Sequence, residues 1–230
     1  MSGSGEHKPV ACIGIILDGN RRWAKEKGLP SLEGHRRGFE LLKDAARWVR
    51  DRGVPHLAVF AFSTENWNRT AEEVSYLMDI FRDAIRDSSD ELGKEGIRVR
   101  FIGERERFAD DIKKGIVEAE EKTKENTKMT LWICLSYGAR AEIVAAAQAA
   151  SAHDGMLTEE LLRQHFWSAE MPDPDIIIRT GGARRLSNFL LWQAAYSELF
   201  FIEPFWPDFS EKILDEILAE YAERERRMGK

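Results

Sequence analysis

Arginines and glycines gather in two short segments of this 230-residue chain, and the first segment also carries an aspartate. One segment reads Asp18-Gly-Asn-Arg-Arg22, and the other runs from Arg179 through two glycines to Arg185 and Ser187. Glycine lets a backbone approach an anion closely, and arginine donates paired hydrogen bonds to a phosphate. Neither segment has the glycine and lysine pattern of a Walker loop. Together they predict a diphosphate site, although each one alone could be a charged surface loop.

A carboxylate inside an arginine-rich anion site is well suited to holding Mg²⁺. Magnesium prefers one or two carboxylates together with phosphate oxygens and water. We therefore expect Asp18 to be one metal ligand and Glu198 to be the second. Taken by itself, Glu198 is equally typical of an acidic residue on the protein surface.

Three aromatic side chains near these segments have both functional and structural interpretations. His35 could donate a hydrogen bond to a phosphate or carry a proton, or it could be an ordinary helix-terminal or core histidine. Trp23 and Trp67 close polar loops and could wall an apolar tunnel. A tryptophan packed on the core is the more frequent situation.

The elements that must position these residues are apolar runs that alternate with longer amphipathic stretches. The apolar runs predict strands over residues 10–17, 57–62, 97–102, 129–135, 176–178 and 199–202. The amphipathic stretches predict helices over residues 33–51, 71–95, 106–126, 139–152, 158–166 and 210–227. This alternation is typical of a parallel sheet covered by helices on both faces.

Polar residues follow four of the six expected strands, in segments 18–23, 63–69, 136–140 and 179–187. Ligands of such sheets bind beyond the carboxyl ends of the strands. We therefore expect the four segments to meet at one edge of the sheet.

Composition limits the class of protein. We expect one domain over residues 10–230 after a flexible tail over residues 1–9, because no segment has the composition of a linker. The net charge of −6 gives no general attraction to nucleic acid. No apolar stretch reaches the roughly 20 residues that would form a transmembrane segment. Cys12 and Cys134 lie in apolar runs, which indicates free thiols in a reducing cytosol and a cytoplasmic protein.

Taken together, the motifs resemble those of the cis-prenyltransferases, the family of undecaprenyl diphosphate synthase. The resemblance spans residues 10–229 and rests on segments 18–25, 34–35, 61–69, 179–182, 185–193 and 206–209 and on Glu198. It implies a single α/β domain with about six mostly parallel strands, flanking helices and a hydrophobic tunnel, assembled as a homodimer. The implied reaction is the Mg²⁺-dependent, head-to-tail condensation of isopentenyl diphosphate onto dimethylallyl, geranyl or farnesyl diphosphate.

The resemblance also assigns roles to individual residues. Asp18, Ser63, Asn66 and Arg69 would be catalytic, and Asp18 and Glu198 would bind Mg²⁺. The substrate-binding residues would be Gly19, Asn20, Arg21, Arg22, Trp23, His35, Trp67, Glu73, Arg179, Arg185, Ser187, Arg227 and Gly229. Among these, Arg179, Arg185 and Ser187 would grip isopentenyl diphosphate, and Arg227 and Gly229 would reach the partner subunit's site.

The strand expected over residues 129–135 departs most from the family pattern. Trp132 stands where the family has a smaller Asn, and Leu135 stands where a small residue is common. We expect these two residues, with Ala61 and Met129, to line the tunnel, and Leu135 to be its floor. Extra bulk in a packed apolar space relaxes poorly, so we expect a short product of about C10–C20. The alternative is that Trp132 points away from the tunnel and changes only core packing.

Other departures leave alternative functions open. Ser31 replaces a usual Arg and Ala183 replaces a frequent Glu, which keeps open an irregular condensation of two allylic diphosphates. A long-chain polyprenyl diphosphate synthase is a further alternative. A non-catalytic subunit is disfavoured, because such subunits lose the Asp-Gly-Asn motif and the arginines.

Overall fold

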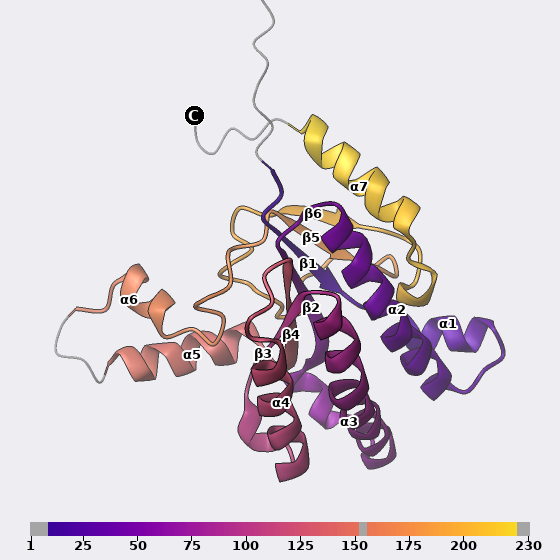
Figure 1. Ribbon diagram of the computed structural model, residues 1–230, viewed down its shortest axis with the longest axis horizontal. Coiled ribbons are helices and arrows are strands. Elements are labelled where there is room, and N and C mark those ends of the chain that lie inside the picture. The colour runs from indigo at the N-terminus through magenta and orange to yellow at the C-terminus, as the bar shows by residue number, and fades with distance from the viewer. Residues whose placement is uncertain (1–8, 152–155, 225–230) are drawn as a thin grey trace, which may run out of the picture.

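Six parallel strands form one sheet in the order β3-β4-β2-β1-β5-β6 (Figure 1). The computed structural model describes residues 9–151 and 156–224, without the side chains of residues 87–89. The strands are β1 Cys12–Ile16, β2 His56–Ser63, β3 Ile97–Ile102, β4 Met129–Tyr137, β5 Ile176–Arg179 and β6 Glu198–Phe201. The predicted strands are confirmed, and the sheet is wholly rather than mostly parallel.

Seven α-helices occur in the described residues. They are α1 Asn20–Glu26, α2 Ser31–Asp51, α3 Ala71–Lys94, α4 Asp110–Thr123, α5 Ala139–Ala150, α6 Glu159–Gln164 and α7 Glu211–Glu223. The long helices α3, α4, α5 and α7 fall within predicted amphipathic stretches, and α2 begins two residues earlier than predicted. Thr158 caps α6 by accepting a hydrogen bond from Leu161 N. Helix α4 begins four residues later than predicted, because residues 105–107 form a separate 3-10 turn.

Alternating residues of the strands bury two different faces of the sheet. On one face, Ile13, Ile15, Leu57 and Val59 pack with α2 and α7, and the neighbouring part of this face packs with α3 and α4. On the other face, Trp132, Cys134 and Ile177 pack with Phe189 and Leu190 of the segment after β5. Helices α5 and α6 stand apart from α2 and α7 on the opposite side of the sheet (Figure 1).

The four polar segments follow the four adjacent strands β4, β2, β1 and β5. Because parallel strands end at the same edge, the segments are placed beside one another, as predicted. Cys12 and Cys134 are buried and free, also as predicted. No helix in the described residues is long and apolar enough to cross a membrane.

Candidate functional site

Asp18 lies just beyond β1, between two arginines. Its Oδ2 atom is 2.8 Å from Nη2 of Arg179, the last residue of β5, and its Oδ1 atom is 3.2 Å from Nη2 of Arg22. Nη1 of Arg179 donates to Ser187 Oγ at 2.7 Å and to the Arg185 carbonyl at 2.5 Å. The Arg179 side chain is only 4% exposed, so its guanidinium is held rigidly at the edge of the sheet.

The turn that presents Asp18 is fixed by its backbone. Thr180 Oγ1 donates to the Asp18 carbonyl at 2.7 Å and accepts from Asp18 N at 3.0 Å, which joins the ends of β1 and β5. Gly19 has φ of 105°, and a Cβ atom there would lie 2.5 Å from the Phe205 ring. Glycine is therefore required at this turn both by backbone conformation and by space.

Arg22 on α1 is held by three different groups. Besides Asp18, its Nη1 donates to the Gly181 carbonyl at 2.8 Å, and its guanidinium lies 5.0 Å from the Phe205 ring centroid. A cation over an aromatic face is attracted by the ring quadrupole. Arg22 is half exposed, so it remains accessible to an anion.

Glu73 on α3 is the centre of a second charged cluster. It lies 2.7 Å from Arg69 Nη1, 3.5 Å from Arg21 Nη1 and 3.6 Å from His35 Nε2, each distance measured to a carboxylate oxygen. Burial, and next the charge of Arg69, lower the pKa of His35 to about 4, against the opposite effect of Glu73. His35 is therefore neutral near pH 7.

Ser63 and Asn66 form a capping box at the end of β2. Asn66 Oδ1 accepts a hydrogen bond from Ser63 N at 3.0 Å, so the amide side chain is oriented by the backbone. Both residues line the same cavity as Asp18 and Arg179.

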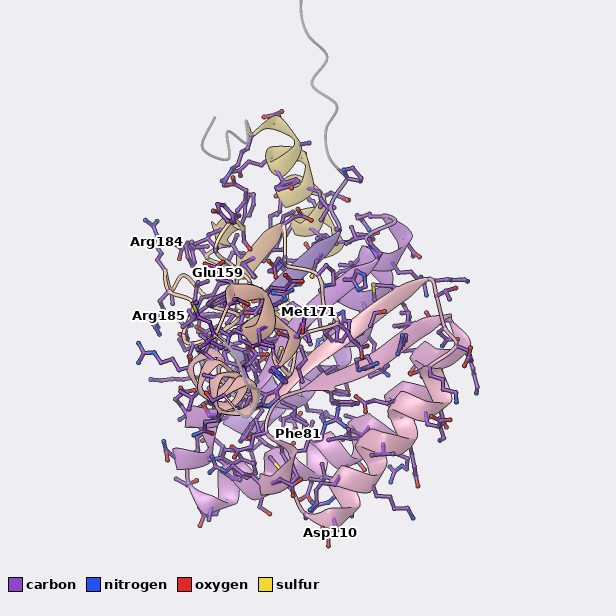
Figure 2. The ribbon with its side chains drawn as sticks, turned by 90° about the vertical axis from the view of Figure 1, so that its left-hand side faces the viewer. Phe81, Asp110, Glu159, Met171, Arg184 and Arg185 are labelled. Atoms are coloured by element: carbon purple, nitrogen blue, oxygen red, sulfur yellow. The ribbon has the colours of Figure 1, made fainter. Side chains whose placement is uncertain are left out.

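This cavity has a volume of about 690 Å³ and is polar at one end and apolar along the rest of its length. Its polar end includes Asp18, His35, Ser63, Glu65, Asn66, Arg69, Arg140, Arg179, Arg185, Ser187 and Asn188. Its apolar length runs between α2 and α3, over Leu135, Ile133 and Leu131 of β4. Figure 2 shows Arg184 and Arg185 projecting from the segment after β5, and Phe81 of α3 among interior side chains. Arg185 lines the cavity, as does Phe81.

Two of the four predicted tunnel residues, Ala61 and Leu135, line the cavity. The prediction is wrong for Trp132, because neighbouring residues of a strand face opposite sides of the sheet. The Trp132 ring packs on the far face, where Nε1 donates to His56 Nδ1 at 3.2 Å. It is wrong also for Met129, which is buried in the core at the start of β4 and does not line the cavity. Leu135 is a wall and not the floor, because the cavity continues past it to Leu131.

Trp23 and Trp67 do not wall the cavity either. Trp23 Nε1 donates to Asp208 at 2.8 Å, beside α1. Trp67 Nε1 donates to Ser136 Oγ at 2.9 Å, and its ring packs on Phe62 and Phe108. Trp23 therefore supports a polar loop by hydrogen bonding, and Trp67 does so by both hydrogen bonding and packing.

Glu198 lies at the opposite end of the sheet from Asp18. It begins β6 and is paired with Ile176, the first residue of β5, whereas Arg179 beside Asp18 ends β5. Three residues of strand correspond to about 10 Å, and Glu198 instead contacts Arg224 Nη1 at 2.7 Å. Within one chain the two carboxylates therefore cannot share a metal ion. Arg227 and Gly229 lie outside the described residues.

Asn20 lies where α1 contacts α2. Asn20 lines the cavity, and its Nδ2 donates to the Leu17 carbonyl at 3.1 Å. Its Oδ1 atom packs closely on Gly38 of α2. A Cβ atom added at Gly38 would lie only 2.2 Å from this oxygen. This contact presses α1 against α2 at the polar end of the cavity.

Several residues at the site were not singled out from the sequence. Asn188 donates to Glu65 at 2.9 Å and accepts from Arg140 N at 2.9 Å, which ties three of the polar loops together. Asn188 lies within a segment that carried the resemblance, so that signal was available. Phe205 had no local signal, because its contact with Arg22 depends on how the chain folds after β6.

Known proteins match this chain over nearly its whole length. Residues 16–229 match the family described as putative undecaprenyl diphosphate synthase. An isoprenyl transferase of Thermotoga maritima is 46% identical over 94% of this chain and 95% of its own. A ditrans,polycis-undecaprenyl-diphosphate synthase of Micrococcus luteus, (2E,6E)-farnesyl-diphosphate specific, is 45% identical over 94% of this chain and 90% of its own.

Solved structures agree with these matches. Lavandulyl diphosphate synthase of Lavandula x intermedia, in complex with dimethylallyl diphosphate, superposes with a TM-score of 0.92 at 33% identity, over 96% of this chain and 98% of its own. A probable undecaprenyl diphosphate synthase of Campylobacter jejuni superposes with a TM-score of 0.84 at 31% identity, over 97% of this chain and 100% of its own. The sheet, the cavity and these matches lead to one conclusion: the chain belongs to the undecaprenyl diphosphate synthase family and is a prenyl transferase of the cis type.

Proposed function

We propose that this enzyme condenses isopentenyl diphosphate onto an allylic diphosphate, with Mg²⁺, and releases a short product of about C10–C20. The observation that carries the proposal is the cluster of Asp18, Arg22 and Arg179 at the mouth of an apolar cavity. The arginines suit diphosphate oxygens, and the cavity behind them suits a hydrocarbon tail.

The two charged clusters divide the substrates between them. Arg179, Arg185 and Ser187 would bind isopentenyl diphosphate, since the Arg179 guanidinium already contacts the other two residues. Gly19, Asn20, Arg21, Arg22, His35 and Arg69 would surround the allylic diphosphate, with Glu73 orienting Arg69, Arg21 and His35. Fixed positive groups aimed at a departing diphosphate stabilise the charge that develops there.

Proton removal would fall to the residues around Asn66. Ser63 holds the Asn66 side chain through its backbone N–H, and both residues line the cavity together with Asp18. The neutral His35 could donate a hydrogen bond to the allylic diphosphate without adding charge.

Asp18 fits the role of a magnesium ligand that binds together with substrate. The described residues hold no group of three or more acidic, His or Cys side chains that could form a metal cage. Magnesium often uses one carboxylate and completes its coordination with phosphate oxygens and water. Bound there, the ion would neutralise charge on the leaving diphosphate.

The cavity volume supports a product shorter than C55. At interior packing density a five-carbon unit needs roughly 110 Å³ and a diphosphate roughly 100 Å³. Two diphosphates leave room for roughly four units in 690 Å³, which corresponds to about C20. Eleven units would need roughly 1,200 Å³.

Irregular condensation is the second candidate function. The close superposition on lavandulyl diphosphate synthase favours it, because that enzyme was solved in complex with dimethylallyl diphosphate, an allylic diphosphate. The contacts of Arg179 with Ser187 and the Arg185 carbonyl favour a dedicated isopentenyl diphosphate site and hence the regular reaction.

We also propose that the enzyme is a homodimer. Strand β6 is an edge strand, and Leu199 on it is 37% exposed. Native proteins usually cover or pair such edges. Light scattering after gel filtration would give the mass of two chains if the proposal is correct.

The function is tested by supplying radiolabelled isopentenyl diphosphate with dimethylallyl, geranyl or farnesyl diphosphate and Mg²⁺, and sizing the dephosphorylated products. We expect labelled C10–C20 alcohols. A main product near C55 would refute the short-chain proposal. Product from dimethylallyl diphosphate alone would support irregular condensation instead.

A further inference from the structure

The cavity ends at the opposite edge of the sheet from Asp18. Leu131 of β4, which lines it there, pairs with Leu57 near the start of β2. Leu92, in the last turn of α3, also lines this end. From Leu135 to Leu131 the cavity covers about 13 Å of strand. A chain growing from the diphosphate end would therefore arrive last at these residues.

One charged side chain, Lys43 of α2, lines this apolar part of the cavity within the described residues. Its neighbours on the wall are Phe39, Leu42 and Leu92. Lysine often packs its alkyl stem on apolar surface while its ammonium group reaches a polar partner. Lys43 Nζ lies 2.9 Å from Glu91 Oε2 of α3.

The Lys43–Glu91 pair is part of a row of ion pairs that joins α2 to α3. Glu91 Oε1 lies 2.5 Å from Arg47 Nη2, and Arg47 also contacts Glu95 at 2.8 Å. Arg50 adds a further contact with Glu95 at 2.7 Å. These pairs span the two helices that enclose the cavity, on the side where it ends.

The pair is partly exposed, with 27% of the Lys43 side chain and 43% of the Glu91 side chain accessible. Ion pairs exposed to this extent contribute little to stability, so the contact can open at low cost. A closed pair and an open pair are therefore both accessible states of the α2–α3 contact.

We propose that the Lys43–Glu91 ion pair is a latch that closes the far end of the cavity and limits the length of the prenyl product. The inference rests on the proposed function, since it concerns the tail that the reaction elongates. When the latch is closed, a tail that reaches Lys43 has no room for another five-carbon unit. When it is open, the tail extends between α2 and α3 toward solvent.

The test uses the full-length enzyme and two variants, Lys43→Met and Glu91→Gln. Each breaks the pair while nearly preserving side-chain size. Asp90→Asn is the matched control, because it removes a pair with Lys122 of the same 2.9 Å length that ties α3 to α4 away from the cavity. All four proteins are given radiolabelled isopentenyl diphosphate and the preferred allylic diphosphate, and the dephosphorylated products are sized.

We expect both latch variants to raise the share of products at least one five-carbon unit longer by about fivefold or more. Asp90→Asn should give the wild-type distribution. Unchanged product lengths with turnover within twofold of wild type would overturn the latch alone. No prenyl product from wild-type enzyme with any starter would overturn the proposed function, and the latch with it.

Discussion

Leu135→Ala should lengthen the product, whereas Trp132→Leu should not. Both residues are bulky and lie on β4, but only Leu135 lines the cavity. Leu135→Ala would free roughly 80 Å³, and a five-carbon unit needs roughly 110 Å³. We therefore expect the main product to shift by no more than one unit, seen by sizing dephosphorylated products.

The same substitution has a cost in stability that can be measured separately. Leu→Ala in a core costs about 2–5 kcal/mol, and we expect about 2–3 kcal/mol because Leu135 already borders a cavity. For a domain of this size that corresponds to a melting temperature lower by roughly 5–10 °C. Calorimetry of the variant measures this change.

Trp132→Leu is the control for bulk on the opposite face. It removes the hydrogen bond to His56 and the contact with Arg100, whose guanidinium lies 5.6 Å from the ring centroid. We expect lower stability with an unchanged product length. If Trp132→Leu lengthened the product as much as Leu135→Ala, the link between the cavity wall and chain length would be refuted.

Three further predictions concern the polar end of the cavity. Phe205→Leu should raise the KM for the allylic diphosphate about three- to tenfold, since it removes a cation–π contact with Arg22. This rise in KM should vanish in an Arg22→Gln background. Arg179→Lys should lower kcat/KM for isopentenyl diphosphate about 10- to 100-fold, because an ammonium group cannot hold Asp18 and Ser187 together. Lowering the pH from 6.5 to 4 should reduce the unfolding free energy by up to about 3 kcal/mol through His35, and urea titrations of His35→Gln should show a smaller reduction.

Each of these has a result that would count against the reasoning. If Phe205→Leu raised the KM for the allylic diphosphate by the same factor in the Arg22→Gln background, Phe205 would act through a residue other than Arg22. Wild-type kcat/KM in Arg179→Lys would show that its paired contacts are unimportant. The sign for His35 follows from its lowered pKa: between pH 4 and 6.5 the unfolded chain binds more protons, so a stability that rose on acidification of the wild type, relative to His35→Gln, would contradict it.

The sheet was predictable because most strands are short apolar runs and four of the six are followed by a polar segment. The apolar runs that became β1 and β5 are buried at every residue, so their hydrophobicity was continuous and easy to find. Parallel strands then had to end at one edge, which placed Asp18 near Arg179 without any knowledge of distances.

The errors came from side-chain direction and from strand ends. Residues 132 and 135 are separated by an odd number, so a regular strand cannot direct both into one cavity. Strand period alone could have excluded Trp132 once Leu135 was chosen. Glu198 does not reach Asp18 within one chain, because a carboxylate at the start of β6 lies at the opposite edge of the sheet.

Contacts between distant loops could not be predicted from local sequence. The position of Phe205 under Arg22 depends on the path of the chain after β6. The extent of the cavity to Leu131 and Lys43 depends on how far α2 and α3 stand apart, which no single segment encodes.

A crystal structure with Mg²⁺, isopentenyl diphosphate and an unreactive thio analogue of the allylic diphosphate tests the central claim most directly. We predict one diphosphate on Arg179 and Ser187, the other on Arg22, the metal ion on Asp18 and the hydrocarbon tail beside Leu135. Diphosphates bound away from these side chains, or a tail outside the cavity between α2 and α3, would contradict the account.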